Sequence, residues 1–231
     1  MSYSAQLKVA PTKAQPLSIA LDALYDEEGQ LILPERSIEY DILVLAIGSV
    51  SNDFGTPGVK EHSYFLDSLE QAERFHRALL NQMLKVNQPN TQQSMLRVSI
   101  VGAGATGTEL AAQLHHVANL SRAYGMPAMS AQRLEISIIE AGPRILPALP
   151  ERIAYAAKNA LQKIGVKLYE DTKVTRAEKN GFVTAEDELI EADLMVWAAG
   201  VKAPNLIKEL DMFETNRAQQ ILVDPQLRAK N

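Results

Sequence analysis

The chain has 231 residues, 46% of them apolar and 22% charged, which is enough apolar material for one large globular domain or two small ones. Its net charge of −5 and the lack of a long lysine–arginine run argue against nucleic acid as a partner. The sequence contains no cysteine, which excludes disulfide scaffolds, iron–sulfur ligation, thiolate zinc sites and redox-active cysteine pairs.

The first predicted elements are strands. Residues 17–25 and 30–40 read as two strands joined by a turn at 26–29. The near-continuous apolar run 40–49 predicts a third, fully buried strand that ends in glycine. Apolar runs of this kind are strand-length, so we expect no membrane-spanning helix, and the first residues show no signal peptide.

A helix follows a turn-rich connector at residues 50–66. Residues 68–86 have helical periodicity, and Ser68 or Asp67 is the predicted N-cap. The apolar positions expected on one side of this helix are Leu69, Ala72, Phe75, Leu79 and Met83. The polar loop 87–94 is a predicted domain boundary.

Residues 97–107, RVSIVGAGATG, are the most informative stretch of the chain. An apolar strand leads into Gly102, Gly104 and Gly107 in G-x-G-x-x-G spacing, and a helical pattern begins at once. Gly102 allows a tight turn, Gly104 lets the backbone approach a pyrophosphate, and Gly107 lets the helix pack closely on the strand. The helix N-terminus then offers free N–H groups to phosphate. The alternative is a glycine-rich turn that binds no ligand.

A second strand, residues 134–140, ends in Glu140. An acid at this place in a dinucleotide fold binds the adenosine ribose hydroxyls and favours NAD over NADP. Glu140 lies 33 residues beyond Gly107, whereas the usual spacing is about 20, and residues 119–133 accommodate the excess as a helix end and loop. The alternatives are an exposed acid without function, or some NADPH use assisted by Arg144.

The remaining elements alternate between helix and strand. They are a helix over 147–165, a strand over 166–170, an antiparallel meander over 172–192, a buried strand over 192–200 and a short strand over 219–224. The buried stripe expected on the helix comprises Ile153, Ala157, Ala160, Leu161 and Ile164. Alternating strands and helices predict a parallel α/β sheet.

Several residues beside the glycine motif are candidates for chemistry. Glu109, on the first helical turn, is predicted to face the nicotinamide end of a dinucleotide, or is simply favoured there by the helix dipole. Thr106 and Thr108 either donate to phosphate or decorate the helix turn. Ala199 and Gly200 end a buried strand at the sheet edge where ligands bind, although Gly200 also suits a plain turn.

A metal site is not expected. Among the histidines only His115 and His116 are close in sequence, and they read as helix surface. Trp197 lies within a predicted buried strand and is expected in the core.

Four segments together resemble type II NADH dehydrogenase, a single-subunit NADH:quinone oxidoreductase of the two-dinucleotide-binding-domain flavoproteins. They are YDILVLAIGSVSNDFGTPGVKEH, IVGAGATGTELAAQL, IEAGPRILPALPERI and EADLMVWAAGVKAPN, and the likeness runs from about residue 17 to residue 228. The stretches GATGTELA and EAGPRILPALP are specific to this family.

The resemblance implies an α/β fold: a Rossmann-like three-layer NAD(P)H-binding domain with a β-meander, flanked by incomplete pieces of an FAD-binding domain. The family passes a hydride from NADH to FAD and reduces quinone. The resemblance also implies that Glu109 lies near the place where nicotinamide and flavin meet and that Gly48 lies on the FAD side. The residues implied to hold or adjoin NADH are Gly102, Gly104, Ala105, Thr106, Gly107, Glu140, Ala199 and Gly200.

The sequence departs from the family pattern in ways that concern flavin. It contains one G-x-G-x-x-G motif where the family has two, and it has no Gly-Asp dipeptide after the strand resembling QQILVDPQLR. We therefore expect an internal fragment with a partial FAD-domain segment at 1–66, a linking helix and loop at 67–94, the NADH-binding domain at 95–207 and a returning FAD-domain segment at 208–231. Such a chain binds NADH, does not retain FAD and is redox-inert alone.

Three readings follow from these observations: the NADH-binding portion of a quinone-reducing enzyme, a nucleotide-binding module without redox activity, and the NAD(P)H domain of another flavoprotein reductase such as a ferredoxin or nitrite reductase. The stretch GPRILPALPERI favours the quinone enzyme. That enzyme would lie peripherally on the cytoplasmic side of the bacterial inner membrane, with this chain itself soluble. Uncovered flanking strands predict either self-association or a fragment that packs its flanking strands together.

Overall fold

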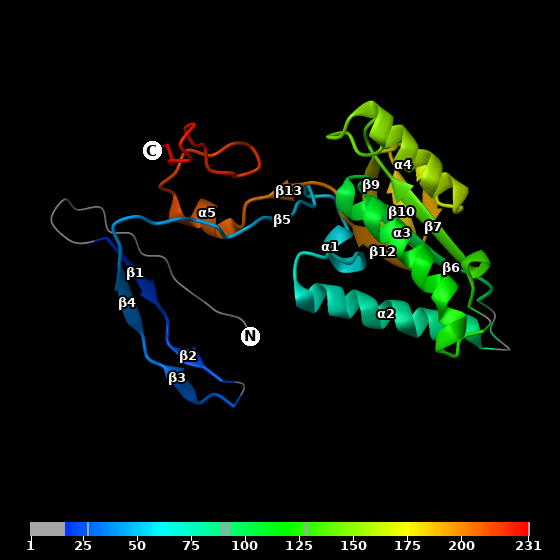
Figure 1. The fold of residues 1–231 in the computed structure, drawn as a ribbon, viewed down its shortest axis with the longest axis horizontal. Coiled ribbons are helices and arrows are strands. Elements are labelled where there is room, and N and C mark those ends of the chain that lie inside the picture. The colour runs from blue at the N-terminus through cyan, green and yellow to red at the C-terminus, as the bar shows by residue number, and fades with distance from the viewer. Residues whose placement is uncertain (1–16, 27, 89–90, 92, 128, 231) are drawn as a thin grey trace. The chain divides into compact units, whose positions relative to one another are not determined.

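The computed structural model describes residues 17–26, 28–88, 91, 93–127 and 129–230 (Figure 1). By their contacts the residues divide into two compact units. The described residues of Ser49–Lys202 form one, which we call the sheet unit, and the described residues of Met1–Gly48 and Ala203–Asn231 form the other, the terminal unit.

The sheet unit is built on a parallel sheet of four strands in the order β12-β6-β7-β8. The strands are β6 (Leu96–Val101), β7 (Leu134–Ile139), β8 (Lys167–Tyr169) and β12 (Leu194–Trp197). In the centre, Val98 of β6 pairs with Leu194 on one side and Ile136 on the other. These strands are nearly continuous apolar runs because both faces of a parallel sheet are covered.

Three helices cover one face of this sheet. They are α2 (Leu69–Asn87), α3 (Ala105–Leu120) and α4 (Glu151–Lys163). Side chains alternate along each strand, so Val98 and Ile100 both point to the helix side, where they join a core with Leu79 of α2, Leu114 of α3 and Leu161 of α4. The core on this face is the larger of the two apolar cores.

An antiparallel meander covers the opposite face. It consists of β9 (Val174–Glu178), β10 (Gly181–Thr184) and β11 (Leu189–Glu191) in the order β11-β10-β9. Val101, Ile139 and Trp197 reach this side and pack around Phe182, whose ring centroid lies 6.2 Å from that of Trp197. Helices, parallel sheet and meander make three layers, which confirms the expected α/β fold with its β-meander (Figure 1).

Polar capping fixes the start of α2. The Ser68 hydroxyl accepts a hydrogen bond from the Gln71 N–H at 3.3 Å, and the Gln71 side-chain oxygen accepts from the Asp67 N–H at 2.7 Å. Ser68 is therefore the N-cap. The predicted buried stripe is confirmed for Phe75, Leu79 and Met83 and is wrong for Leu69 and Ala72, which are exposed at the helix start.

The buried stripe of α4 is shifted from its predicted position. Ala154 and Leu161 are buried, with Ala157 and Ile164 partly so, whereas Ile153 is exposed. Ala160, also predicted on the stripe, is exposed. The face that meets the sheet core thus runs through positions three and four residues apart from Ala154, a choice that packing makes and periodicity alone does not.

Short elements complete the sheet unit. They are β5 (Val50–Ser51), α1 (Val59–His62), the 3₁₀ turns Ser121–Tyr124 and Ala131–Arg133, and β13 (Val201–Lys202). Strands β5 and β13 pair antiparallel, which joins the connector to the chain that follows β12.

The described part of the terminal unit contains the predicted hairpin. β1 (Ser18–Leu21) pairs with β4 (Arg36–Glu39), and β2 (Leu24–Tyr25) pairs with β3 (Leu31–Leu33), both antiparallel. The turn is held by the Asp26 carboxylate, which accepts from the backbone N–H groups of Glu28 and Gln30. Helix α5 (Asn205–Leu210) follows in the later part of this unit.

Two predicted strands are wrong. Residues 40–49 form no strand, and Ile42 and Val44 are 85% and 79% exposed. The run has strand chemistry, but a strand needs a neighbouring strand, and no strand of the described residues pairs with it; the Tyr40 N–H at its start donates to the Leu17 carbonyl oxygen at 2.9 Å. Residues 219–224 form only isolated bridges, between Thr215 and Ile221 and between Val223 and Ala229.

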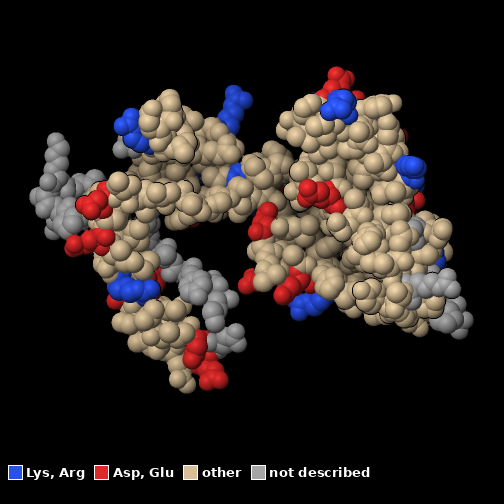
Figure 2. Space-filling model, viewed as in Figure 1, with Lys and Arg blue, Asp and Glu red and all other residues tan. Residues whose placement is uncertain are grey.

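The contacts divide the chain after Gly48 and after Lys202, so residues 49–66 and helix α2 cluster with the glycine motif. No helix of the described residues is long and apolar enough to cross a bilayer. On the face drawn in Figure 2, the lysine and arginine side chains of the described residues are scattered rather than gathered over one element.

Candidate functional site

The sheet unit contains a cavity of about 400 Å³ at the carboxyl ends of the parallel strands. It is lined from β6 by Val101, Gly102 and Gly104, from β7 by Ile139–Ala141, and from β12 by Trp197–Gly200. Residues 172–174, Pro147 and the connector residues Phe54 and Thr56 complete the wall. Ligands of open α/β sheets bind at this edge.

The three glycines of the motif have different surroundings. Gly102 has a φ of +104°, and a Cβ there would lie 2.7 Å from the backbone of Ala198 and Ala199. A Cβ on Gly107 would collide with the Gly102 carbonyl oxygen, so Gly107 is what lets α3 pack on the turn. Gly104 has an ordinary φ of −71°, and a Cβ there would meet no described atom within 4 Å. Gly104 instead borders the cavity.

The N-terminus of α3 meets the glycine turn. Gly104 is its N-cap, and the exposed residues Ala105 and Thr106 form the first turn, whose N–H groups have no partner within the helix. The Thr108 hydroxyl donates to the carbonyl oxygens of Gly104 and Ala105 at 2.9 and 3.0 Å. Thr108 therefore braces the turn, and the free N–H groups are what the helix offers an anion.

Glu140 braces the cavity wall from the end of β7. One carboxylate oxygen accepts from the Ala103 N–H and the other from the Gly142 N–H, each at 2.8 Å. The carboxylate is partly buried and borders the cavity, so it is not an isolated surface acid. Each oxygen keeps a further lone pair for an outside donor.

The loop after Glu140 locks onto the glycine turn. The Leu146 N–H donates to the Ala103 carbonyl oxygen at 2.8 Å, and Leu146 is held at a left-handed φ of +49°. Arg144 donates to the carbonyl oxygens of Leu146, Pro147 and Leu149. The guanidinium of Arg144 is thus engaged by its own loop.

The connector closes the cavity at the β12 end. The Trp197 indole N–H donates to the Asn52 carbonyl oxygen at 2.8 Å, and the Asn52 N–H donates to the Gly200 carbonyl oxygen at 3.3 Å. Trp197 is buried, as predicted, yet it also borders the cavity. Gly200 has a φ of +65°, and the Phe54 ring occupies the space beside it.

A charge cluster anchors the connector. The Asp53 carboxylate lies 3.3 Å from the Lys60 ammonium and 4.0 Å from the Lys202 ammonium. Burial opposes ionisation of Asp53, but hydrogen bonds from Lys60 and Gly55, with the charges of Lys60 and Lys202, outweigh it and hold the pKa of this carboxyl below its ordinary value.

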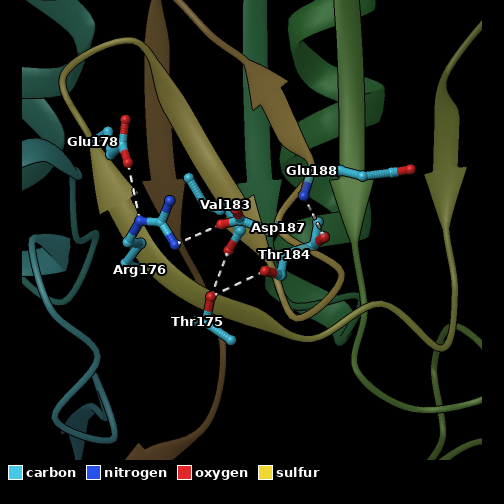
Figure 3. Close-up of polar contacts among 7 residues, drawn as sticks. All are labelled: Thr175, Arg176, Glu178, Val183, Thr184, Asp187 and Glu188. Carbon is cyan, nitrogen blue, oxygen red and sulfur yellow. Dashed lines mark hydrogen bonds and ion pairs between the residues drawn. The ribbon is translucent and has the colours of Figure 1, made fainter.

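The meander turns are held by polar contacts away from this cavity (Figure 3). Arg176 donates to the carboxylates of Glu178 and Asp187 at 2.9 and 3.0 Å, and the Thr175 hydroxyl bonds the carbonyl oxygens of Val183 and Thr184. The ion pairs are exposed, so they add little to stability, and the cluster is structural.

The structure brings together Gly102, Gly104, Glu140, Ala199 and Gly200 around one cavity. Ala105 and Thr106 lie at the adjoining helix start, and Gly107 lies beneath the turn. Glu109 is exposed on α3 and does not border the cavity. Gly48 belongs to the terminal unit, where it is exposed with a φ of +73°.

Sequence reasoning missed Phe54 and Lys173 as cavity residues. Lys173 precedes the meander and lines the Glu140 side, because the Thr172 N–H donates to the Glu140 carbonyl oxygen at 2.9 Å. Phe54 sits in a turn-rich segment, and a large aromatic residue in such a segment was the available signal.

A family model described as pyridine nucleotide-disulphide oxidoreductase matches residues 17–231. Type II NADH:quinone oxidoreductase of Haemophilus influenzae is 39% identical over 219 residues, which cover 89% of this chain and 49% of that protein. The Mycobacterium tuberculosis protein of the same description is 27% identical, over 87% of this chain and 47% of that protein. The chain spans about half the length of these curated relatives.

Solved structures share the fold. NDH2 from Plasmodium falciparum in complex with NADH superposes with a TM-score of 0.69 at 24% identity, covering 83% of this chain and 39% of that one. An NAD-dependent persulfide reductase from A. fulgidus gives a TM-score of 0.66 at 21% identity, over 98% of this chain and 36% of the other.

Proposed function

Because the chain belongs to the pyridine nucleotide-disulphide oxidoreductase family, we propose that the cavity of its sheet unit binds NADH. We further propose that the chain is the NADH-binding portion of a type II NADH:quinone oxidoreductase. The similarity to the Haemophilus influenzae enzyme over 89% of this chain supports this assignment.

The observation that carries the proposal is the open space beside Gly104. Gly102 and Gly107 are needed for the fold itself, because a Cβ at either would strike backbone. A Cβ on Gly104 would point into space that no described atom fills, next to the free N–H groups of α3. A glycine without a steric reason in the protein, at a helix N-terminus, fits the close approach of a pyrophosphate.

Glu140, at the end of β7, sets the orientation of NADH in this cavity. Glu140 keeps lone pairs for two ribose hydroxyls, and its negative charge repels a 2′-phosphate. The adenosine ribose then lies beside β7, and the pyrophosphate lies over Gly104 and the first turn of α3. Arg144, which donates to three carbonyl oxygens of its own loop, is not free to attract a 2′-phosphate.

The whole enzyme would use FAD as its second cofactor, which accepts a hydride from NADH and then reduces quinone. The residues of this chain contribute binding and orientation of the nucleotide. Gly48, the residue predicted on the FAD side, is exposed, and the segment that leads to it pairs with no described strand.

The cellular setting follows from the same assignment. The whole enzyme would act peripherally at the cytoplasmic face of the bacterial inner membrane, where NADH is formed and quinone is dissolved in the bilayer. The electrons would leave through quinone, and neither a metal ion nor nucleic acid takes part.

Titration calorimetry of the 231-residue chain with NADH tests the proposal. We expect saturable binding with one NADH per chain, and weaker binding of NADPH because of the charge on Glu140. A chain that is folded by circular dichroism and releases no heat of binding with NADH would contradict the assignment.

The absorbance spectrum of the same preparation tests the redox part. We expect no flavin bands and no NADH:quinone turnover by this chain alone. Stoichiometric FAD in the purified protein would show that this chain does hold flavin, and the binding-module description would then be wrong.

A further inference from the structure

Phe54 is an unusual residue for a surface loop. Its side chain is 65% exposed, and its φ of +52° lies in the left-handed region that a phenylalanine rarely adopts. The ring lies over Gly200: an ideal Cβ on that glycine would be 2.5 Å from the Phe54 Cζ. The ring borders the cavity at the carboxyl end of β12.

The loop around Phe54 is fixed at several points. Trp197 and Gly200 bind the backbone of Asn52, and the Asn52 side-chain oxygen accepts from the Phe54 N–H at 3.0 Å. Asp53 is paired with Lys60 and lies near Lys202. A strained conformation persists only where its surroundings over-determine it, and this feature is found mostly at functional sites. These contacts thus hold the exposed Phe54 ring in a fixed position at the cavity.

The strand order determines which end of a dinucleotide meets this ring. In the order β12-β6-β7-β8, the glycine turn after β6 lies between Glu140, at the end of β7, and Gly200, after β12. A nucleotide with its adenosine ribose at Glu140 and its pyrophosphate over Gly104 extends its other nucleoside toward β12. Gly200 has no side chain that would block this second nucleoside, and the Phe54 ring lies over Gly200.

We propose that Phe54 is a binding residue for the nicotinamide ring of NADH, packing its own ring against that end of the ligand and shielding it from water. The inference rests on the proposed function. The inference adds to the proposed function by assigning the two ends of the cavity to different parts of the ligand. Aromatic contacts of this kind change affinity by about 10-fold.

The test compares NADH with ADP-ribose, which has the adenosine, both phosphates and the second ribose but lacks nicotinamide. In calorimetric titrations, Phe54→Ala is expected to weaken NADH binding about 10-fold and to leave ADP-ribose binding nearly unchanged. Phe54→Tyr keeps the ring and is expected to retain NADH affinity. Tyr124→Ala removes another exposed aromatic ring that does not border the cavity, and serves as the control.

Each other outcome overturns the inference in a recognisable way. Equal losses for NADH and ADP-ribose would show that Phe54 shapes the loop and does not contact nicotinamide. Unchanged NADH binding in Phe54→Ala would show that the ring plays no part. If the wild-type chain binds neither ligand, the proposed function fails, and this inference fails with it; if the wild type binds both, only the role of Phe54 is decided.

Discussion

Gly102, Gly104 and Gly107 share a motif but meet different surroundings. A Cβ on Gly102 or Gly107 would strike backbone, whereas one on Gly104, which borders the cavity, would meet no described atom within 4 Å. The sequence predicts this division, because each position has a mechanical reason in a strand–turn–helix unit. The hydrogen bonds that Glu140 accepts from the Ala103 and Gly142 N–H groups were not predictable, since they depend on where the loop after β7 returns.

Replacement of Glu140 tests nucleotide preference at the scale of one residue. Glu140→Gln removes the charge that repels a 2′-phosphate and weakens the hydrogen bonds to ribose, which are worth about 1.5–3 kcal/mol each when charge-assisted. We expect the NADH/NADPH affinity ratio to narrow several-fold in parallel titrations. Circular dichroism controls for loss of the Ala103 and Gly142 contacts, and a wild-type chain that binds both nucleotides equally would contradict the role.

At the scale of elements, helices and strands were predicted correctly where local sequence signals mark them. The meander, the parallel strands and α2 were predicted because turn residues, apolar runs and a capping serine mark them locally. The run 40–49 has the same strand chemistry and forms no strand, because a sequence pattern does not supply the neighbouring strand. Phe54 was missed because its role depends on the distant residues Gly200 and Trp197.

The connector loop gives a pH-dependent prediction. The pKa of Asp53 is held below its ordinary value of 3.8, so its ion pairs stabilise the fold above that pH and are lost as the pH falls through the lowered pKa. Asp53→Asn should therefore lower the free energy of urea unfolding near neutral pH, and the difference from wild type should shrink in acid below about pH 4. The exposed Glu186→Gln is the control for loss of one surface charge. A difference that is constant over this range would mean that the charge of Asp53 is not responsible.

At the scale of the whole molecule, the sheet unit contains every residue that lines the cavity, from Phe54 to Gly200. The terminal unit contains Gly48 and the run 40–48, in which Ile42, Val44 and Ile47 are exposed. We therefore expect nucleotide binding to be a property of the sheet unit. The sequence predicted the three-layer architecture of this unit through its resemblance, because the family motifs cover nearly all of it.

The single tryptophan makes the central claim directly measurable. Trp197 borders the cavity, so bound NADH is expected to quench its fluorescence, and no other tryptophan in the chain obscures the signal. Gly104→Val should abolish this quenching and leave circular dichroism unchanged, because the added side chain fills ligand space and meets no described atom near its Cβ. Gly107→Ala, in contrast, should lower the free energy of unfolding by about 1–3 kcal/mol or more, because its added Cβ clashes with the Gly102 carbonyl oxygen. A folded Gly104→Val variant that binds NADH with unchanged affinity would contradict the assignment of this cavity.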